Sequence, residues 1–351
     1  QTEFGVGMLG KLVARQLKIP VIHTLHTKYE DYVHYIAKGK ILRPGMVKYI
    51  IKSYLFGVDG IIVPSAIVLD IVNGYGVNLE KRVIPTGIEL NKFVRPEITA
   101  EDCADLRASL GILPDETMLL SLSRIAEEKN IQSIVKHLAT IRDQVKVKLV
   151  IVGSGPYADK LQKLVSDLAL DDIVIFTGLV DNSQTAYYYK AADFFISAST
   201  SETQGLTYIE ALASGTPVLA TDNAYLQSLI TEPVFGRLFA SDDDIAATIL
   251  AAITETPSFD QARYDQKLYE ISAENFALRV YEFYLDKIIS NDQYLAEKGE
   301  SIPRRTARIV RQAPGKTVKT VARTPKKVAY FAKKAIKHAK ILNKYGKIKL
   351  K

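Results

Sequence analysis

The sequence is poor in cysteine and in long apolar runs. Among its 351 residues only Cys103 is a cysteine, which excludes an internal disulfide framework and favours a reducing, cytoplasmic environment. It has no run of 18 or more apolar residues, so no membrane-spanning helix is predicted. The hydrophobic fraction of 47% is typical of a globular protein, and the length suffices for two α/β domains with an appendage.

Acidic residues are absent from the end of the sequence. Residues 301–351 carry 17 lysines and arginines and no aspartate or glutamate, whereas the rest of the chain has 29 basic and 39 acidic residues. The body therefore has a net charge of −10 and the tail one of +17. This asymmetry predicts that the tail has an electrostatic role of its own.

The basic tail contains one strongly amphipathic segment, Lys326–Lys344 (KKVAYFAKKAIKHAKILNK). On a helical wheel its apolar face comprises Val328, Phe331, Ala332, Ala335, Ala339 and Leu342, and its opposite face comprises Lys326, Lys333, Lys337, Lys340 and Lys344. This pattern predicts an interfacial helix on anionic lipid, to which each lysine contributes about 1 kcal/mol. The alternative is a disordered solubilising or nucleic-acid-binding arm. Because no recognition motif accompanies the charge, we expect no nucleic-acid partner.

A second amphipathic segment, Pro44–Phe56, lies near the start of the chain. It carries Lys48 and Lys52 beside a broad apolar side. We predict that this helix also contacts the membrane, and the alternative is an ordinary core helix.

Short β-branched runs alternate with helical periodicity from about Pro20 onwards. This alternation predicts a parallel sheet with crossover helices. The expected strands are Val21–Leu25, Gly60–Val63, Lys81–Ile84, Thr117–Leu122, Lys148–Val152, Ile173–Phe176, Phe194–Ser197, Pro217–Ala220 and Val234–Phe239, with helices that include Asn130–Arg142, Tyr157–Ala169 and Leu206–Ser214. Ile84–Pro96 is the expected interdomain linker. We predict domains over 1–90 and 91–270, a helix over 271–300 that packs back toward the first domain, and a basic tail over 301–351.

The first predicted domain is short of strands. Only two or three strands precede or include Lys81, whereas a doubly wound domain needs roughly five. The opening residues QTEFGVGMLGKLVARQLKIP are typical of the middle of an α/β unit. We therefore expect an N-terminal domain that lacks about 90 residues. We therefore also expect residues 117–220 to bind a ligand, but little or no turnover by this chain.

The most informative motif is Thr200–Ala220, TSETQGLTYIEALASGTPVLA. Glu202 is expected in the turn after a strand, and Glu210 about one turn into the following helix. The N–H groups of residues 205–207 (Gly205, Leu206 and Thr207) would then be unpaired donors at a helix start, which suit phosphate oxygens. Two flanking carboxylates suit hydroxyl-rich groups such as a hexose and a ribose. The alternative is a plain helix with surface glutamates.

Two further loops follow predicted strands. In SRIAEEKN (123–130), Arg124 and Lys129 are placed to reach a diphosphate and to neutralise the charge that develops on it, although a solvated charged loop is the alternative. In VGSGP (152–156), Gly153 and Gly155 allow the backbone to approach a ligand closely. All three motifs lie at carboxyl ends of strands, where open α/β sheets bind ligands.

Four motifs together closely resemble family 4 of the retaining GT-B glycosyltransferases: SRIAEEKN, VGSGP, FTGLVDN and SETQGLTYIEALASGTPVLATD. The resemblance extends in order along the chain, from about Thr2 to Ile289. The resemblance implies two Rossmann-like domains that face a cleft. It implies that Arg124 and Lys129 hold the donor diphosphate, that Glu202 positions the hexose and Glu210 the ribose, and that the backbone of Gly178, Leu179 and Val180 meets the nucleobase. Gln204 departs from the family's usual aromatic residue.

The segment IHTLHTKYEDYVHYI contains His23, His26 and His34. Metal ligation is conceivable, but the set is not closed, and we predict no metal site. The segment is similar to HTxHTxYEDY of the bacterial diacylglycerol glucosyltransferases, which implies that His26 faces the donor sugar and β-phosphate. We interpret His23 and His34 as structural.

The resemblance implies a retaining transfer of glucose from UDP-glucose to 1,2-diacylglycerol at the cytoplasmic face of the membrane, by front-face attack. No cofactor is obligatory, and stimulation by Mg²⁺ is left open. The alternatives are an enzyme of this family with another acceptor (glucosyl-diacylglycerol, polyprenyl-linked or soluble) and a non-catalytic protein that binds UDP-sugar or lipid.

Overall fold

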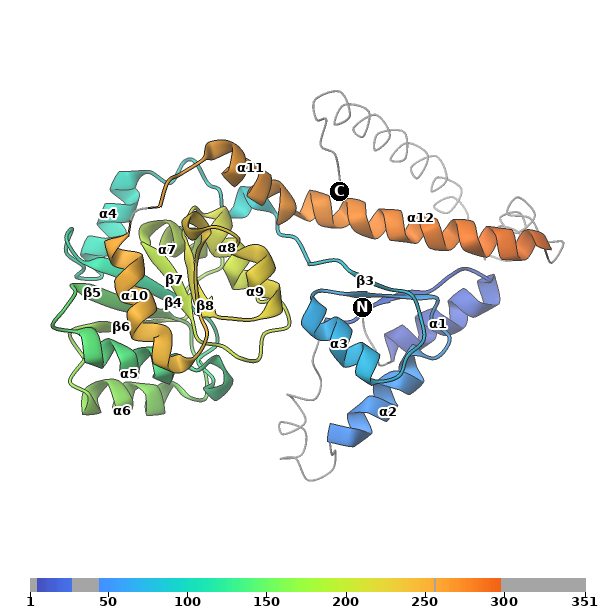
Figure 1. The fold of residues 1–351 in the computed structure, drawn as a ribbon, viewed down its shortest axis with the longest axis horizontal. Coiled ribbons are helices and arrows are strands. Elements are labelled where there is room, and N and C mark those ends of the chain that lie inside the picture. Colours follow the sequence, from blue (N-terminus) through green and yellow to red (C-terminus); the bar gives the residue numbers. More distant parts are fainter. Residues whose placement is uncertain (1–4, 27–43, 256, 298–351) are drawn as a thin grey trace. The chain divides into compact units, whose positions relative to one another are not determined.

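The computed structural model describes residues 5–26, 44–255 and 257–297 (Figure 1). These residues divide into two compact units. Of these described residues, unit 1 holds 24–26, 44–55, 61–255 and 257–277, and unit 2 holds 5–23, 56–60 and 278–297.

A six-stranded parallel sheet forms the centre of unit 1. Its strands are β4 (Thr117–Leu122), β5 (Val147–Val152), β6 (Val174–Gly178), β7 (Phe194–Ser197), β8 (Val218–Thr221) and β9 (Gly236–Phe239). Their order across the sheet is β6-β5-β4-β7-β8-β9, and each neighbouring pair is parallel. Renumbered within the sheet this order is 3-2-1-4-5-6, the doubly wound Rossmann arrangement, whose strand order reverses between β4 and β7.

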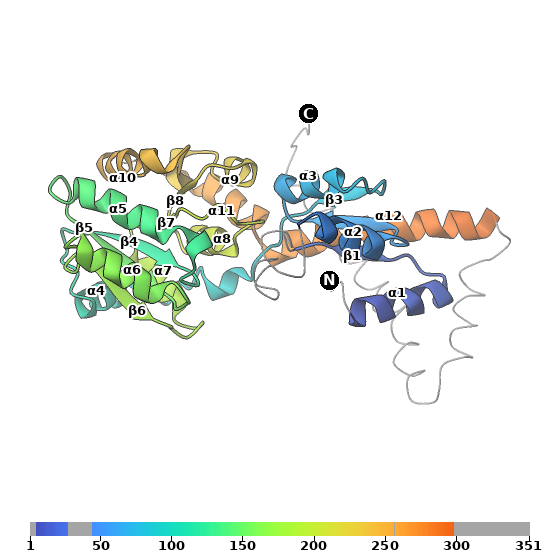
Figure 2. The same ribbon diagram turned by 90° about the horizontal axis from the view of Figure 1, so that it is seen from below.

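Helices cover both faces of this sheet (Figures 1 and 2). They are α4 (Ala100–Ser109), α5 (Ile131–Ile141), α6 (Ala158–Asp167), α7 (Thr185–Ala191), α8 (Leu206–Ala213), α9 (Ala224–Leu229), α10 (Ile245–Thr254) and α11 (Gln261–Glu270). Successive strand residues point to opposite faces, so Met118 and Leu120 pack in the core formed with α7, α8 and α9, while Leu119 packs in the core formed with α5, α6 and α10. Because both faces are buried, the central strands are mostly apolar and do not alternate between apolar and polar residues.

A smaller sheet has the order β1-β2-β3, formed by β1 (Ile22–Thr24), β2 (Gly60–Val63) and β3 (Lys81–Val83). All of β2 is buried, and β2 and β3 pair in parallel. Helix α3 (Ala66–Gly74) follows β2, and the Ser65 side chain caps its start by accepting a hydrogen bond from the N–H of Val68. Helix α2 (Pro44–Leu55) precedes the same strand.

Unit 2 contains α1 (Val6–Leu17) and most of α12 (Ala273–Glu297). Gly60 lies against the Phe283 side chain, where an added Cβ would be only 2.7 Å from the ring. The Asn291 amide donates to the carbonyl of Lys18 at 3.3 Å, and the Lys11 ammonium donates to the carbonyl of Phe56 at 2.8 Å. These contacts join the two ends of the described chain within one unit.

The predicted strands all form, three of them (β2, β4 and β7) with the predicted bounds. The last strand begins two residues later than predicted, at Gly236, because Pro233–Phe235 forms a short 3-10 helix, and β6 is shifted to Val174–Gly178. The predicted tail helix lies outside the described residues. No helix within the described ranges is both long and apolar enough to span a bilayer.

Candidate functional site

The site motifs occupy the carboxyl-terminal edge of the six-stranded sheet. Arg124 and Lys129 follow β4, Leu179 and Val180 follow β6, and Glu202 follows β7. The strands β4 and β7 are neighbours at the point where the strand order reverses, which is where open α/β sheets bind their ligands. The fold therefore brings the two most informative motifs to adjacent strand ends.

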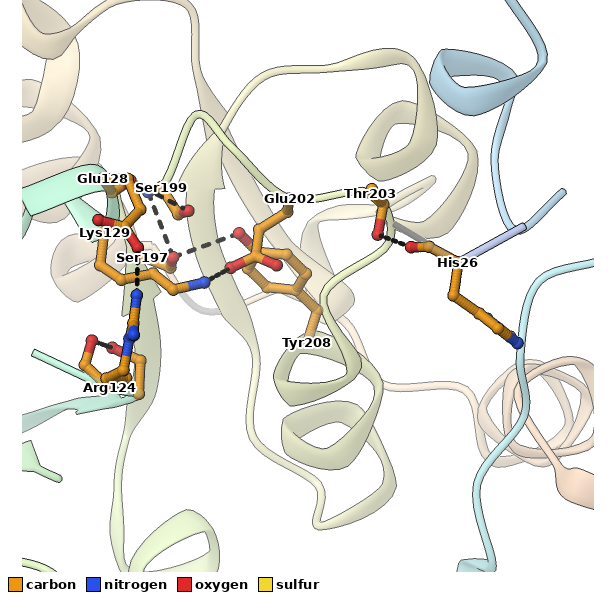
Figure 3. Close-up of polar contacts among 10 residues, drawn as sticks. His26, Arg124, Glu128, Lys129, Ser197, Ser199, Glu202, Thr203 and Tyr208 are labelled. Atoms are coloured by element: carbon orange, nitrogen blue, oxygen red, sulfur yellow. Dashed lines mark hydrogen bonds and ion pairs between the residues drawn. The ribbon is translucent and has the colours of Figure 1, made fainter. Parts of the chain in front are cut away.

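The loops after β4 and β7 are joined by an ion pair between Lys129 and Glu202 (Figure 3). Both side chains are about one-fifth exposed, at 21% and 22%. Arg124 makes a separate ion pair with Glu128 at 2.7 Å, and it is half exposed. Each of the two predicted cations thus already has a carboxylate partner in the protein.

The start of α8 lies between the two glutamates. Gly205 is its N-cap, with a left-handed φ of 73°, and no side chain from the described residues caps the helix there. A Cβ on Gly205 would lie 2.4 Å from the Tyr208 ring, so this position requires glycine. The first N–H groups of any α-helix have no intrahelical acceptor and carry partial positive charge. The N–H groups of Leu206 and Thr207 are therefore suited to an anion.

Glu210 lies within α8 and its carboxylate has a buried partner. The hydroxyl of Tyr189, on α7, donates to Glu210 Oε2 at 2.9 Å. Burial raises the pKa of Glu210, and the hydrogen bond from Tyr189 opposes that rise. The sequence motif located Glu210, whereas Tyr189 was missed because a tertiary contact between two helices leaves no local signal.

The residues between Glu202 and Gly205 are held by hydrogen bonds to three segments of unit 1. The Thr203 hydroxyl donates to the carbonyl of His26 at 3.1 Å, and the Ser65 hydroxyl donates to the carbonyl of Thr203 at 2.5 Å. The Gln204 side chain accepts from the N–H of Thr86 at 2.9 Å and donates to the carbonyl of Thr86 at 2.7 Å. Gln204 is 5% exposed, so the residue that departs from the family pattern has a structural role that the sequence did not reveal.

The glycines after β5 contact backbone of the protein itself. A Cβ on Gly153 would lie 2.0 Å from the carbonyl oxygen of Ser123, and one on Gly155 would lie 2.2 Å from that of Ile125. The N–H of Ile125 also donates to the carbonyl of Ser154 at 3.0 Å. These glycines therefore let the VGSGP loop pack against the loop that carries Arg124.

The predicted nucleobase segment follows β6. Gly178 has a φ of 72°, and no described atom lies within 4 Å of the position of an added Cβ. Leu179 is 80% exposed, whereas Val180 packs partly against the core. The backbone at Gly178 is therefore open on the side where a Cβ would lie.

The histidine prediction is only partly described. The His26 carbonyl accepts from Thr203, and Figure 3 shows its imidazole directed away from Glu202. His23 is buried at 2% exposure, in keeping with a structural interpretation, and His34 lies outside the described residues. The described ranges contain no group of three or more His, Cys, Asp or Glu side chains arranged to hold a metal ion.

Of the predicted membrane-binding residues, those in α2 are described and those in the tail are not. In α2, Tyr49 is 72% exposed and Met46 is 47% exposed, while Ile51, Tyr54 and Leu55 are buried. Lys52 is exposed and Lys48 is half-buried. The helix thus has one face in the core and an exposed side with apolar residues and Lys52. Outside the described residues lie Lys326, Lys333, Lys337 and Lys340.

A cavity of about 260 Å³ lies elsewhere, beside the residues that precede β8 and around Phe235, Phe259 and Tyr264. None of the predicted site residues lines it. The candidate site is thus distinguished by its charge, by helix polarity and by its position at the sheet edge.

This arrangement combines cations, helix-start amides and two carboxylates at one strand edge. The cations and amides can neutralise a diphosphate, and the carboxylates can accept hydrogen bonds from sugar hydroxyls. The chemistry available is binding of a nucleotide sugar and stabilisation of its diphosphate leaving group.

Comparison with known families agrees with this arrangement. Residues 103–268 match the family of group 1 glycosyl transferases, and residues 2–92 match Glycosyltransferase Family 4. The chain is 55% identical over 320 residues to the alpha-monoglucosyldiacylglycerol synthase of Streptococcus pneumoniae (strain ATCC BAA-255 / R6). The aligned region covers 91% of this chain and 73% of that protein. The chain is 32% identical over 308 residues to the enzyme of the same name from Acholeplasma laidlawii, which covers 85% and 77%.

Solved structures show the same GT-B fold. Sucrose-phosphate synthase from Thermosynechococcus elongatus superposes with a TM-score of 0.66 at 25% identity, over 81% of this chain and 72% of that one. HepE of Anabaena, solved with UDP and glucose, superposes with a TM-score of 0.58 at 18% identity, over 83% and 74%. The fold predicted from the sequence is confirmed.

Proposed function

The chain belongs to the family 4 glycosyltransferases with the GT-B fold, and from this premise we propose that it transfers glucose from UDP-glucose to 1,2-diacylglycerol, with retention of the anomeric configuration. A hexosyltransferase needs a donor site, and the edge between β4 and β7 supplies one. The observation that carries the proposal is the meeting there of Lys129, Glu202 and the start of α8.

In the proposed donor complex the diphosphate lies against the α8 start, with Lys129 and Arg124 beside it. Glu202 then accepts hydrogen bonds from hexose hydroxyls, and Glu210 accepts them from the ribose. The uracil lies along residues 178–180. Lys129 is already held at the site by Glu202, so part of the entropy of ordering its side chain is lost before the donor binds.

The transfer step breaks the bond between the sugar C1 and the β-phosphate oxygen and forms a bond from C1 to the acceptor hydroxyl oxygen on the same face. The acceptor proton passes to the departing phosphate oxygen. Charge therefore builds up on the β-phosphate, where the lysine and the helix-start amides stabilise it. Positioning supplies the rest of the rate enhancement.

The acceptor is proposed from the relatives, which are named as monoglucosyldiacylglycerol synthases. Diacylglycerol stays in a bilayer, so the enzyme must work at a membrane surface. The exposed apolar face of α2, with Lys48 and Lys52 on that helix, supports peripheral binding to anionic lipid. We propose that this occurs on the cytoplasmic face and that the basic segment over 326–344 adds to it.

The proposal is tested on the full-length native protein, with radiolabelled UDP-glucose as donor and diacylglycerol in anionic vesicles as acceptor. The expected product is an α-linked monoglucosyl lipid, formed faster than with UDP-galactose. Lys129→Ala should lower the rate at least about 100-fold. Lys146→Ala is the matched control, because Lys146 is a 71% exposed lysine that pairs with Asp115, and it should change the rate less than about twofold.

Three outcomes would overturn this proposal. Transfer only to a soluble acceptor, without dependence on anionic lipid, would identify the protein as an enzyme of this family with another acceptor. Binding of UDP without release of UDP from UDP-glucose would indicate a non-catalytic protein. A β-linked product would exclude retention.

A further inference from the structure

Tyr189 is a fully buried tyrosine whose hydroxyl has one recorded partner, the carboxylate of Glu210. The side chain is 0% exposed, and its hydroxyl donates to Glu210 Oε2 at 2.9 Å. The ring packs against Phe93 at 6.1 Å and Phe195 at 5.7 Å between centroids. The Thr216 hydroxyl also donates to the Tyr189 carbonyl at 2.5 Å. Ring and backbone are thus both fixed.

We propose that Tyr189 is a positioning residue that orients the Glu210 carboxylate for the two ribose hydroxyls of the donor, and that it thereby makes the site selective for ribonucleotides over deoxyribonucleotides. The inference rests on the proposed function, because it requires a nucleotide sugar in this site. It assigns the selectivity to a residue that lies behind the carboxylate and does not touch the donor.

The reason lies in the number of acceptor positions on a carboxylate. An ionised carboxylate has two oxygens and about four lone-pair positions. Tyr189 uses one position on Oε2, which fixes the plane of the carboxylate and leaves Oε1 for ribose hydroxyls. The fixed ring cannot follow Glu210 if that side chain rotates, so the hydrogen bond favours one rotamer. A glutamate already in the binding rotamer loses less entropy when the donor binds.

The pKa of each group, Glu210 and Tyr189, is affected by the other. Burial raises the pKa of Glu210, and the Tyr189 hydrogen bond counters this effect. Burial and the nearby Glu210 charge also raise the pKa of Tyr189 well above its ordinary value, so the hydroxyl remains a donor. Tyr189 is therefore the donor of this hydrogen bond and Glu210 the acceptor, as the 2.9 Å contact shows.

A purely structural role for the hydroxyl is the competing explanation, and Tyr264 provides the matched control. The Tyr264 hydroxyl is also partly buried and donates to the carbonyl of Leu212, at the far end of the same helix α8, at 3.0 Å. Tyr264→Phe removes a hydroxyl that contacts α8 but leaves Glu210 and Tyr189 unchanged. A general effect of loosening α8 should therefore appear in both variants.

The test measures dissociation constants for UDP and for 2′,3′-dideoxy-UDP by calorimetry. The unmodified protein and Tyr264→Phe should prefer UDP at least about tenfold, as expected for hydrogen bonds to a charged group. Tyr189→Phe should lower this preference to about threefold or less. The ratio of two constants measured on one sample does not depend on the folded fraction, so partial unfolding does not obscure the result.

A double substitution completes the test. In a Glu210→Ala background, adding Tyr189→Phe should leave the preference unchanged, because the hydroxyl acts only through Glu210. An undiminished preference in Tyr189→Phe alone, or an equal loss in Tyr264→Phe, would overturn the inference. Failure of the unmodified protein to bind UDP would instead overturn the proposed function.

Discussion

Substitution of Gln204 by alanine should destabilise unit 1 measurably. The side chain is 5% exposed and makes three hydrogen bonds, two with the backbone of Thr86 and one with the hydroxyl of Tyr225 at 3.4 Å. Each hydrogen bond contributes about 1 kcal/mol net, and a buried group left without a partner adds to the loss. Because the third bond is long and Thr86 is only half-buried, we expect a loss of about 2–4 kcal/mol in the free energy of unfolding.

The assay is denaturant unfolding of Gln204→Ala beside Gln227→Ala. Gln227 is an exposed glutamine with one hydrogen bond, to Asp222 Oδ2 at 3.0 Å, so its loss should cost less than about 0.5 kcal/mol. Gln204→Glu adds a sharper comparison, because the introduced carboxylate keeps an acceptor for the Thr86 N–H but places an oxygen against the Thr86 carbonyl. Protonation restores a donor, so this variant should regain stability as the pH falls. A Gln204→Ala protein as stable as the Gln227→Ala control would refute the reasoning.

Two further predictions concern the carboxylates. Glu202→Ala should weaken binding of UDP-glucose by about tenfold, because the hexose loses a hydrogen-bond acceptor. UDP alone should bind as well or better, because Lys129 is released from its ion pair. Calorimetry with both ligands measures the difference, and equal weakening of the two would contradict the role assigned to Glu202. Glu210→Gln should stabilise the fold increasingly as the pH rises. The folded-state pKa of Glu210 is raised by burial, so the favourable contribution of the native side chain is fully present below its ordinary pKa of 4.5 and is lost as the pH rises through the folded value. Thermal unfolding between pH 4 and pH 8 measures this difference, and a stability gap that narrows with rising pH would be incompatible with it.

Much of the fold was accessible from local sequence patterns. The strands β4, β5 and β7 are mostly apolar because helices cover both faces of the sheet, and each strand is followed by a polar loop. The site motifs directly follow these runs, so the strand prediction also placed Arg124 and Glu202 at one sheet edge. That the two loops meet follows from strand order, which brings β4 beside β7.

What the sequence did not reveal depends on tertiary contacts with backbone groups or between helices. Gln204 bonds the peptide groups of Thr86, 118 residues earlier in the chain, and any residue except proline would offer the same backbone groups. Tyr189 reaches Glu210 from a different helix, so no sequence spacing marks the pair. From the sequence, the glycines of VGSGP are equally compatible with a ligand-binding loop and with a loop that packs on its neighbour. Only the structure shows the packing, because a Cβ on Gly153 would lie 2.0 Å from the carbonyl oxygen of Ser123.

The proposed function depends most on the donor site at the edge between β4 and β7. A crystal structure with UDP-glucose bound tests this site most directly. In that structure the diphosphate should lie at the N–H groups of Leu206 and Thr207 with Lys129 beside it, the ribose on Glu210, and the hexose on Glu202. A nucleotide bound elsewhere on the protein, with the Lys129–Glu202 ion pair unchanged and the start of α8 empty, would contradict it.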